Sequence, residues 1–210
     1  MPIPPDDAMS VNQDLLEGHL LHSCPVYRIY EPRETTIVMG AGRRDRGDVI
    51  LEAARRDRVP VLIRRGGGGT VVLSQGMVVL ALVTSVDSPF ENRQYAGRVN
   101  AWQKEALRGL GVEDLNDRGI SDVALGERKI LGTSIFRRRN ILFYQSSLLV
   151  GNDLSLFTRY LTFPSSVPDY RRGRSHEEFC TTLRREGYDF AAADVILRLR
   201  GIVSSRLASL

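Results

Sequence analysis

Four consecutive glycines at residues 66–69 follow directly on an apolar segment, residues 61–65, that is predicted to form a strand. Glycine has no Cβ, so such a run can adopt positive φ angles and lets a ligand approach the backbone closely. The residues that come next, Val71–Leu73, are β-formers again. The run therefore leads into a strand, not into a helix, and no Gly-Lys-Ser/Thr follows it, which excludes a P-loop and a dinucleotide-binding fingerprint.

The glycine run is predicted to bind an anion. Successive N–H groups in a tight turn form a concave site that attracts negative charge. Arg64 and Arg65 stand at its entrance, and guanidinium groups can hold a phosphate or a carboxylate through paired hydrogen bonds. The alternative is a flexible hairpin loop with two surface arginines, which is less economical because four glycines cost backbone entropy.

Length and composition predict one domain, residues 1–210, with a well-buried core: the chain is 42% hydrophobic and 26% charged. The longest apolar stretch, residues 71–86, contains Ser74, Gln75 and Gly76 and is too short and too polar to cross a bilayer. The N-terminus does not read as a secretory signal. Two cysteines do not make a disulfide framework. We therefore expect a cytoplasmic protein that does not bind membranes.

The net charge of +4 does not by itself indicate a nucleic-acid partner, because 25 acidic residues are interspersed with the 29 basic ones. Only two of those basic residues are lysines, Lys104 and Lys129. A lysine in a chain that otherwise uses arginine suggests a need for a compact and flexible point charge. Because Lys104 falls on a predicted surface helix, Lys129 is the more interesting of the two.

The order of the predicted elements indicates an α+β fold with a mixed, largely antiparallel sheet and flanking helices. Leu15, Leu16, Leu20 and Leu21 are expected to form the apolar side of the first helix, and Trp102 is expected to pack in the core. Strands are predicted at residues 26–30, 36–39, 61–65, 71–73 and 77–84 and as a meander over 120–150, and helices at 10–22, 48–57, 90–110, 153–161, 175–186 and 191–207.

Two motifs carry a resemblance to a known family. Ser121-Asp122, followed by Gly126-Glu127-Arg128-Lys129-Ile130-Leu131-Gly132-Thr133-Ser134, resembles the Asn-Asp pair and the Gly-Asp-Arg-Lys-Val-Ser-Gly-Ser-Ala hairpin of lipoate-protein ligase A enzymes. Arg64 and residues 67–71 are similar to the family's Arg-x-Ser-Gly-Gly-Gly-Ala-Val loop. The similarity continues in the same order along most of the chain, and the two motifs are specific only jointly.

The resemblance implies the catalytic domain of a biotin/lipoate ligase, which is similar to class II synthetases. It implies that lipoate and ATP form lipoyl-AMP and pyrophosphate, and that the acyl group then passes to a lysine of a lipoyl domain or of an H-type protein. No tightly bound cofactor is implied. Lys129 would be catalytic, and Asp122 is a candidate ligand of Mg²⁺. ATP and lipoate would be bound by Arg64, Gly67, Gly68, Gly69, Thr70, Val71, Val72, Gly76, Asp122, Gly132, Thr133 and Ser134.

The chain also departs from the family pattern. Leu73-Ser74 stands where the family has His-Asp, and Tyr144-Gln145 stands where it has two histidines. The chain is also too short to include the C-terminal accessory domain of the longer ligases, so either it is a compact version or a separate accessory protein completes the activity.

Two other functions stay open. An octanoyl or lipoyl transferase would take the acyl group from a carrier without ATP, and Cys180 would be its nucleophile. Cys180 falls on a predicted helix with no activating base nearby in the sequence, so a buried small hydrophobe is the favoured reading. A non-catalytic lipoyl assembly partner is the third reading. The basic segment 170–174 is a candidate to close over phosphates or to meet an acidic lipoyl domain.

Overall fold

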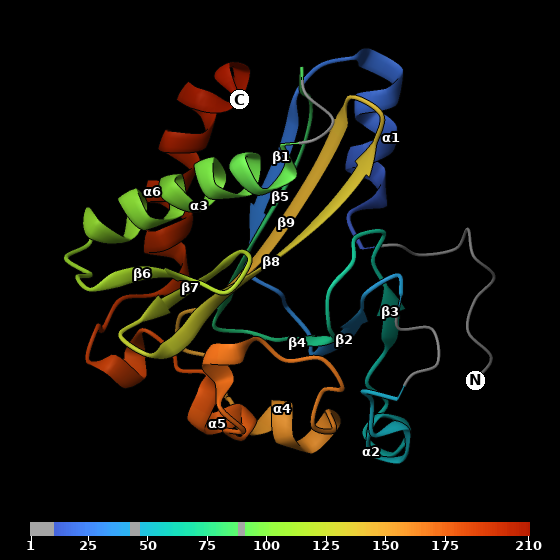
Figure 1. Cartoon of the computed structure of the whole chain (residues 1–210), viewed down its shortest axis with the longest axis vertical. Helices are drawn as coiled ribbons and strands as arrows, with labels where there is room; N and C mark the ends of the chain where they lie inside the picture. The colour runs from blue at the N-terminus through green and yellow to red at the C-terminus, as the bar shows by residue number, and fades with distance from the viewer. Residues whose placement is uncertain (1–10, 43–46, 88–90) are drawn as a thin grey trace.

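Six antiparallel strands form the main sheet of the computed structural model, which describes residues 11–42, 47–87 and 91–210. The strand order is β1-β5-β9-β8-β7-β6, and a second sheet has the order β3-β2-β4 (Figure 1). The strands are β1 (Val26–Tyr30), β2 (Thr36–Met39), β3 (Val61–Ile63), β4 (Val71–Leu73), β5 (Met77–Ser85), β6 (Leu115–Arg118), β7 (Asp122–Leu125), β8 (Arg128–Arg138) and β9 (Ile141–Leu149).

Helices flank both sheets. The two longest, α3 and α6, pack together on one face of the main sheet, while α2 and α4 lie near the small sheet and α5 packs between α4 and β8 (Figure 1). The predicted α+β architecture is confirmed. The helices are α1 (Gln13–His22), α2 (Leu51–Arg56), α3 (Asn92–Arg108), α4 (Ser155–Tyr160), α5 (His176–Phe179) and α6 (Ala192–Arg206), with 3-10 turns at Asp169–Arg171, Arg184–Glu186 and Leu207–Ser209.

Strand β5 is buried on both of its faces. Its residues Val78, Leu80 and Leu82 share a core cluster with α3 and α6, and that cluster also holds Trp102 as predicted. The alternate residues face the other way, where Val79 packs with the small sheet and Ala81 packs with α1. This double burial explains why the strand reads as a continuous apolar run rather than as an alternation.

The glycine run does not connect the two strands of a hairpin. Strand β2 lies between β3 and β4, parallel to β3 and antiparallel to β4, so the run has to pass the end of β2. The N–H of Ala41, just beyond β2, donates to the carbonyl of Gly66 at 3.0 Å. The hairpin alternative is therefore wrong, and the run is a crossing between two strands that do not pair.

The predicted helix over residues 175–186 is wrong. Ser175 and Glu178 form a capping box that starts a helix, but α5 ends after one turn at Phe179. The chain then extends, and the N–H of Thr181 donates to the carbonyl of Lys129 at 3.0 Å. Backbone pairing with β8 therefore replaces the helix that the local propensity favoured.

Three smaller differences also have physical reasons. Leu20 and Leu21 are exposed, because Leu15, Leu16 and His19 form the side of α1 that faces the sheet. The strand predicted at 61–65 ends at Ile63, where Arg64 turns inward. Strand β6 was not predicted, because its sequence, Leu-Asn-Asp-Arg, is polar and lies at the edge of the sheet.

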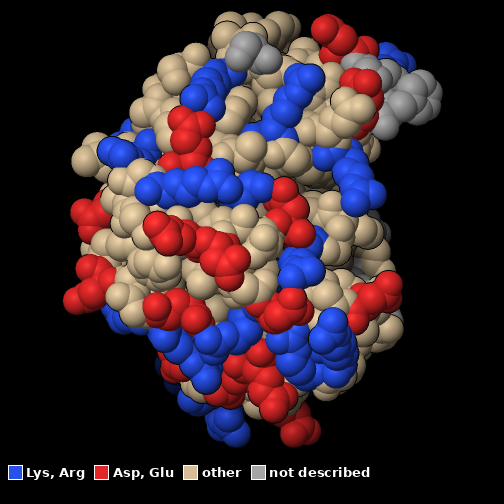
Figure 2. All heavy atoms as spheres, turned by 60° about the vertical axis from the view of Figure 1, so that its left-hand side comes forward, with Lys and Arg blue, Asp and Glu red and all other residues tan. Residues whose placement is uncertain are grey.

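Charges of both signs are mixed on the face that Figure 2 shows, without a continuous basic stripe. Opposite charges also pair among the described residues, for example Arg206 with Glu105 at 2.6 Å and Lys104 with Asp117 at 2.5 Å. Within the described part of the chain, none of the helices combines the length and the apolar character needed to cross a bilayer.

Candidate active site

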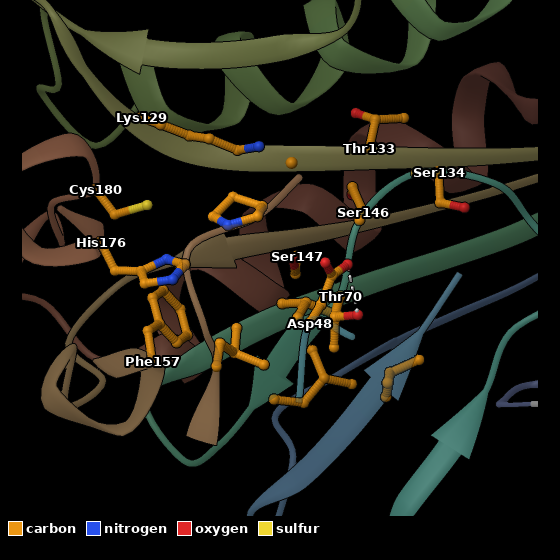
Figure 3. A pocket seen from close by; sticks show the side chains of 18 of the residues that line it. Asp48, Thr70, Lys129, Thr133, Ser134, Ser146, Ser147, Phe157, His176 and Cys180 are labelled. Carbon is orange, nitrogen blue, oxygen red and sulfur yellow. Dashed lines mark hydrogen bonds between the residues drawn. The ribbon is translucent and has the colours of Figure 1, made fainter. Parts of the chain in front are cut away.

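A cavity of about 270 Å³ opens where the two sheets meet the segment that follows β9. Its walls are mainly apolar, and a few polar side chains project into it, among them Asp48, Thr70 and Lys129 (Figure 3). A cavity of this kind can hold an apolar chain with one polar end. The apolar lining residues are Val11, Val38, Val71, Leu73, Val79, Leu149, Phe157, Leu161 and Phe179.

Lys129 reaches the cavity from β8, and its ammonium points along the strand (Figure 3). The Nζ lies 2.7 Å from Oδ1 of Asp122 on the neighbouring strand β7. A Cβ at position 132 would lie 3.0 Å from this Nζ, so the ammonium occupies space that only a glycine leaves open. The sequence of the hairpin thus fixes both the charge and its direction.

Asp122 is held from the other side by Tyr170. The Tyr170 hydroxyl donates to Oδ2 of Asp122 at 2.9 Å. Burial, and then the Asp122 carboxylate, raise the pKa of Tyr170 well above its usual value, so the phenol stays protonated and remains a donor. Because Tyr170 belongs to the basic segment 170–174, that segment is tied to the lysine through Asp122.

The glycine run is held in shape by Arg64. This side chain is buried, and its Nη2 donates to the carbonyls of Gly67 at 2.8 Å and Gly69 at 2.7 Å. Its Nε donates to Ser134 Oγ on β8 at 2.9 Å, and its Nη1 donates to the Val38 carbonyl at 3.2 Å. The Arg64 donors thus bind the protein itself, whereas the sequence suggested that they would grip a ligand.

The N–H groups of the run are available, by contrast. Gly67, Gly68 and Gly69 are exposed, and within the described residues no acceptor takes a hydrogen bond from their N–H groups. Gly68 has a φ of 94°, which a residue with a side chain would adopt only with strain. A rigid loop with unpaired N–H groups has the features of an anion site.

A buried polar network supports the floor of the cavity. The Tyr144 hydroxyl donates to Asn100 Oδ1 at 2.6 Å and accepts from Gln103 at 2.8 Å, and Ser146 donates to Gln103 at 3.0 Å. Burial raises the pKa of Tyr144 to about 12, so it stays neutral. Thr133 joins the network through the Ser121 carbonyl at 2.8 Å. Where the family pattern has histidines, this chain has a neutral network between β9 and α3.

The structure brings most of the predicted site residues together. Four of them do not line the cavity. Gly67 contributes its carbonyl to Arg64, Val72 is in the core, Gly76 forms a turn packed against Asn152, and Asp122 acts through Lys129. The predicted residues that line the cavity are Arg64, Gly68, Gly69, Thr70, Val71, Lys129, Gly132, Thr133 and Ser134.

These residues do not form a Mg²⁺ site by themselves. Both oxygens of Asp122 already have protein partners, Lys129 and Tyr170. Among the described residues, no three His, Cys, Asp or Glu side chains are grouped so that they could hold a metal ion. Mg²⁺ commonly binds through one or two carboxylates together with substrate phosphates. The assignment of Asp122 as a Mg²⁺ ligand therefore stays a prediction that this geometry does not favour.

Cys180 lies beside the lysine and not on a helix. Its backbone pairs with that of Lys129, and its side chain lines the cavity (Figure 3). Burial raises the pKa of its thiol to about 11, although Lys129 and Arg171 act in the opposite direction. The thiol is therefore protonated near neutral pH and is a poor nucleophile.

We expect Cys180 to react with iodoacetamide at pH 7.5 at least about 100-fold more slowly than the exposed Cys24. Mass spectrometry of peptides after timed alkylation measures both rates in one sample, so Cys24 is the internal control. Because protonation protects the thiol, the Cys180 rate should rise as the pH approaches 11. Equal rates at pH 7.5 would contradict the burial argument and would favour a nucleophilic role.

Sequence reasoning missed the individual roles of several cavity residues. Arg171 was only one member of a basic segment, and nothing in the sequence distinguishes it from its exposed neighbour Arg172. Phe157 and Phe179 read as ordinary core residues, and Asp48 reads as the start of a helix. Each became recognisable only when distant segments met at the cavity.

The chain matches the model of the lipoyl protein ligase A/B catalytic domain over residues 4–201. Among curated proteins it is 25% identical over 149 residues to "Lipoate-protein ligase A subunit 1" of Thermoplasma acidophilum, which covers 67% of this chain. The matched segment spans only 56% of that relative, so the chain corresponds to about half of its length.

Two solved structures have the same fold. A crystal structure of lipoate-protein ligase A bound with ATP superimposes with a TM-score of 0.75 at 21% identity, over 88% of this chain and 73% of that one. A bi-partite lipoate protein ligase of T. acidophilum, solved with its E2 lipoyl domain, also gives 0.75 at 20% identity, over 88% and 71%. With the family model matching nearly its whole length, this chain belongs to the lipoyl protein ligase A/B catalytic-domain family.

Proposed function

We propose that the protein is an ATP-dependent lipoate-protein ligase, which activates lipoate to lipoyl-AMP and transfers the lipoyl group to a lysine of an acceptor protein. One observation carries the proposal. The ammonium of Lys129 and the unpaired N–H groups of the glycine run serve one apolar cavity. Membership of the family and the names of the relatives support a ligase that acts on lipoate.

The geometry suits the chemistry of adenylation. The reaction brings a carboxylate against the α-phosphate, so two anions have to meet and negative charge builds up on the transferring phosphoryl group. A preorganised cation at that point stabilises the transition state more than the separate substrates. Lys129, directed by Asp122 and placed over Gly132, is in a position to do this. Gly68 and Gly69 would donate to phosphate oxygens, and Val79 and Leu149 would contact the acyl chain.

ATP and Mg²⁺ belong to the proposal as substrate and accompanying ion. A structural neighbour is described as bound with ATP. Since the described residues do not build a carboxylate cage, we propose that Mg²⁺ enters with the ATP phosphates. The reduced Cys24 and Cys180 suit a cytoplasmic location, which is part of the same proposal.

The proposed acceptor is a lipoyl domain or an H-type protein, and the proposed system includes a separate accessory chain. The relative from T. acidophilum is named as one subunit, and the neighbouring structure is described as bi-partite with an E2 lipoyl domain. These descriptions support a two-part system for this chain as well.

One assay tests the function. The protein is incubated with an apo-lipoyl domain, lipoate and Mg-ATP, with and without a candidate accessory chain, and the acceptor mass is read. We expect a lipoyl increment that depends on ATP. No increment under any of these conditions would contradict the proposal. Octanoyl transfer from an acyl carrier without ATP would favour the transferase, whose only support here is the position of Cys180 in the cavity.

A further inference from the structure

Arg171 is a buried cation without a counter-ion. It is 4% exposed, yet it lines the same cavity as Lys129. Its Nε donates to the carbonyl of Arg174 at 2.9 Å. Its Nη2 is buried without a hydrogen-bond partner, and no described carboxylate forms an ion pair with it. Burying an unpaired charge is costly, so a partner from outside the chain is expected.

Two aromatic rings hold the guanidinium but do not satisfy its donors. Its Cζ lies 4.6 Å from the centroid of the Phe163 ring and 5.0 Å from that of Phe179. A cation–π contact uses the face of the guanidinium, while the N–H bonds lie in its plane. Both rings lie within cation–π range of the guanidinium but accept no conventional hydrogen bond, so its terminal nitrogens, for which no described residue is an acceptor, are left for a group with planar geometry, such as a carboxylate.

The neighbours of Arg171 place it at the same end of the cavity as the lysine. Phe179, over which it stacks, directly precedes Cys180, and the backbone of Cys180 pairs with that of Lys129. Asp48 enters the cavity from a different wall, beside Thr70 (Figure 3). Asp48 therefore lies on a different wall from the two cations, which attract an anion and orient an amphipathic acid with its carboxylate toward Lys129 and Arg171.

We propose that Arg171 binds the carboxylate of the acyl substrate, so that Lys129 is free to follow the charge that develops on the phosphoryl group. The inference rests on the proposed function and deepens it, because it names a second anion-binding residue and the class of ligand, a straight-chain carboxylic acid. The phosphates, by contrast, are left to the N–H groups of the glycine run.

The test compares octanoate with octanamide, which has the same chain but no charge. Isothermal titration calorimetry without ATP gives the Kd of each compound for the wild type, Arg171→Met and the matched control Arg172→Met, whose side chain is exposed. We expect the wild type and the control to prefer octanoate by about 10- to 100-fold, the usual range for a hydrogen bond to a charged group. In Arg171→Met this preference should be lost, while the Kd of octanamide stays within about threefold of the wild type.

Three results would overturn the inference. Equal weakening of both compounds in Arg171→Met would mean that Arg171 only supports the shape of the cavity. A preference for octanoate that persists in Arg171→Met would mean that the carboxylate binds elsewhere. Unchanged octanoate binding in Arg171→Met, together with a weaker Kd for ATP in a separate titration of the same variants, would mean that Arg171 contacts a phosphate. Wild-type protein that binds neither compound, and neither activates nor transfers lipoate, would contradict the proposed function itself.

Discussion

We expect Lys129→Met to lower the rate of acyl-adenylate formation by about 100- to 1,000-fold, the usual loss when a preorganised charge is removed from a developing anion. The methionine retains much of the length and apolar character of the side chain, so the cavity wall should survive. Pyrophosphate release with lipoate and Mg-ATP measures the rate. The chain offers a matched control in its only other lysine, Lys104 on α3, which forms an ion pair with Asp117 on β6.

Lys104→Met should retain the wild-type rate within about twofold, because its surface ion pair has little effect on the site.

A second variant, Lys129→Arg, tests whether charge alone is sufficient. The ammonium lies 3.0 Å from the position that a Cβ would take on Gly132, and a planar guanidinium is larger. We therefore expect most of the loss to remain. If Lys129→Met kept more than about a tenth of the activity, Lys129 would not be the activating group.

Arg64→Met should have the second-largest effect, and it should act on the loop. The substitution removes the donors to the carbonyls of Gly67, Gly69 and Val38. The Gly67 carbonyl keeps the Ser134 hydroxyl as a donor and the exposed end of the loop can find water. Because a buried acceptor that loses its partner costs about 1–3 kcal/mol, we expect the free energy of unfolding to fall by about 3 kcal/mol. Urea unfolding measures the fall, and the affinity for ATP should drop by about tenfold as the loop loses its shape.

Arg65→Met is the control for this variant. Arg65 is adjacent but exposed, and its hydrogen bond to Gln13 lies on the surface. Its removal should change the free energy of unfolding by less than about 0.5 kcal/mol. A loss of ATP affinity in Arg64→Met without any loss of stability would show that Arg64 contacts the phosphates directly, as the sequence alone suggested.

The sequence predicted correctly those helices and strands that are specified by the pattern of their own residues. The apolar run of β5, the helical spacing around Trp102 and the hairpin that carries Lys129 were each read correctly because neighbouring residues define them. The lysine, the glycine run and the residues after Lys129 meet at one cavity, as the two motifs together predicted.

The errors lie where contacts between distant residues decide the structure. The capping box at Ser175 is real, but the pairing of Thr181 with Lys129 ends the helix, and no local signal reports a contact across that distance. The inward turn of Arg64 depends in the same way on Ser134 and Val38. The parallel pairing of β2 with β3 could not be predicted either, because the pattern of apolar and polar residues along a strand does not specify which strand it pairs with.

Strand β8 connects the catalytic candidate Lys129 with the glycine run. It carries the lysine near one end and, at Ser134, the hydroxyl that donates to Gly67 of the glycine run at 3.0 Å. Because the ammonium of Lys129 already extends to Gly132, only two residues of strand, or about 7 Å, separate it from the anchor of the loop. Because β8 is hydrogen-bonded to β7 on one side and to β9 on the other, its length hardly changes, and it fixes the distance between the ammonium of Lys129 and the glycine run. An insertion between Lys129 and Ser134 would change that distance, whereas a substitution in the cavity wall would leave it unchanged.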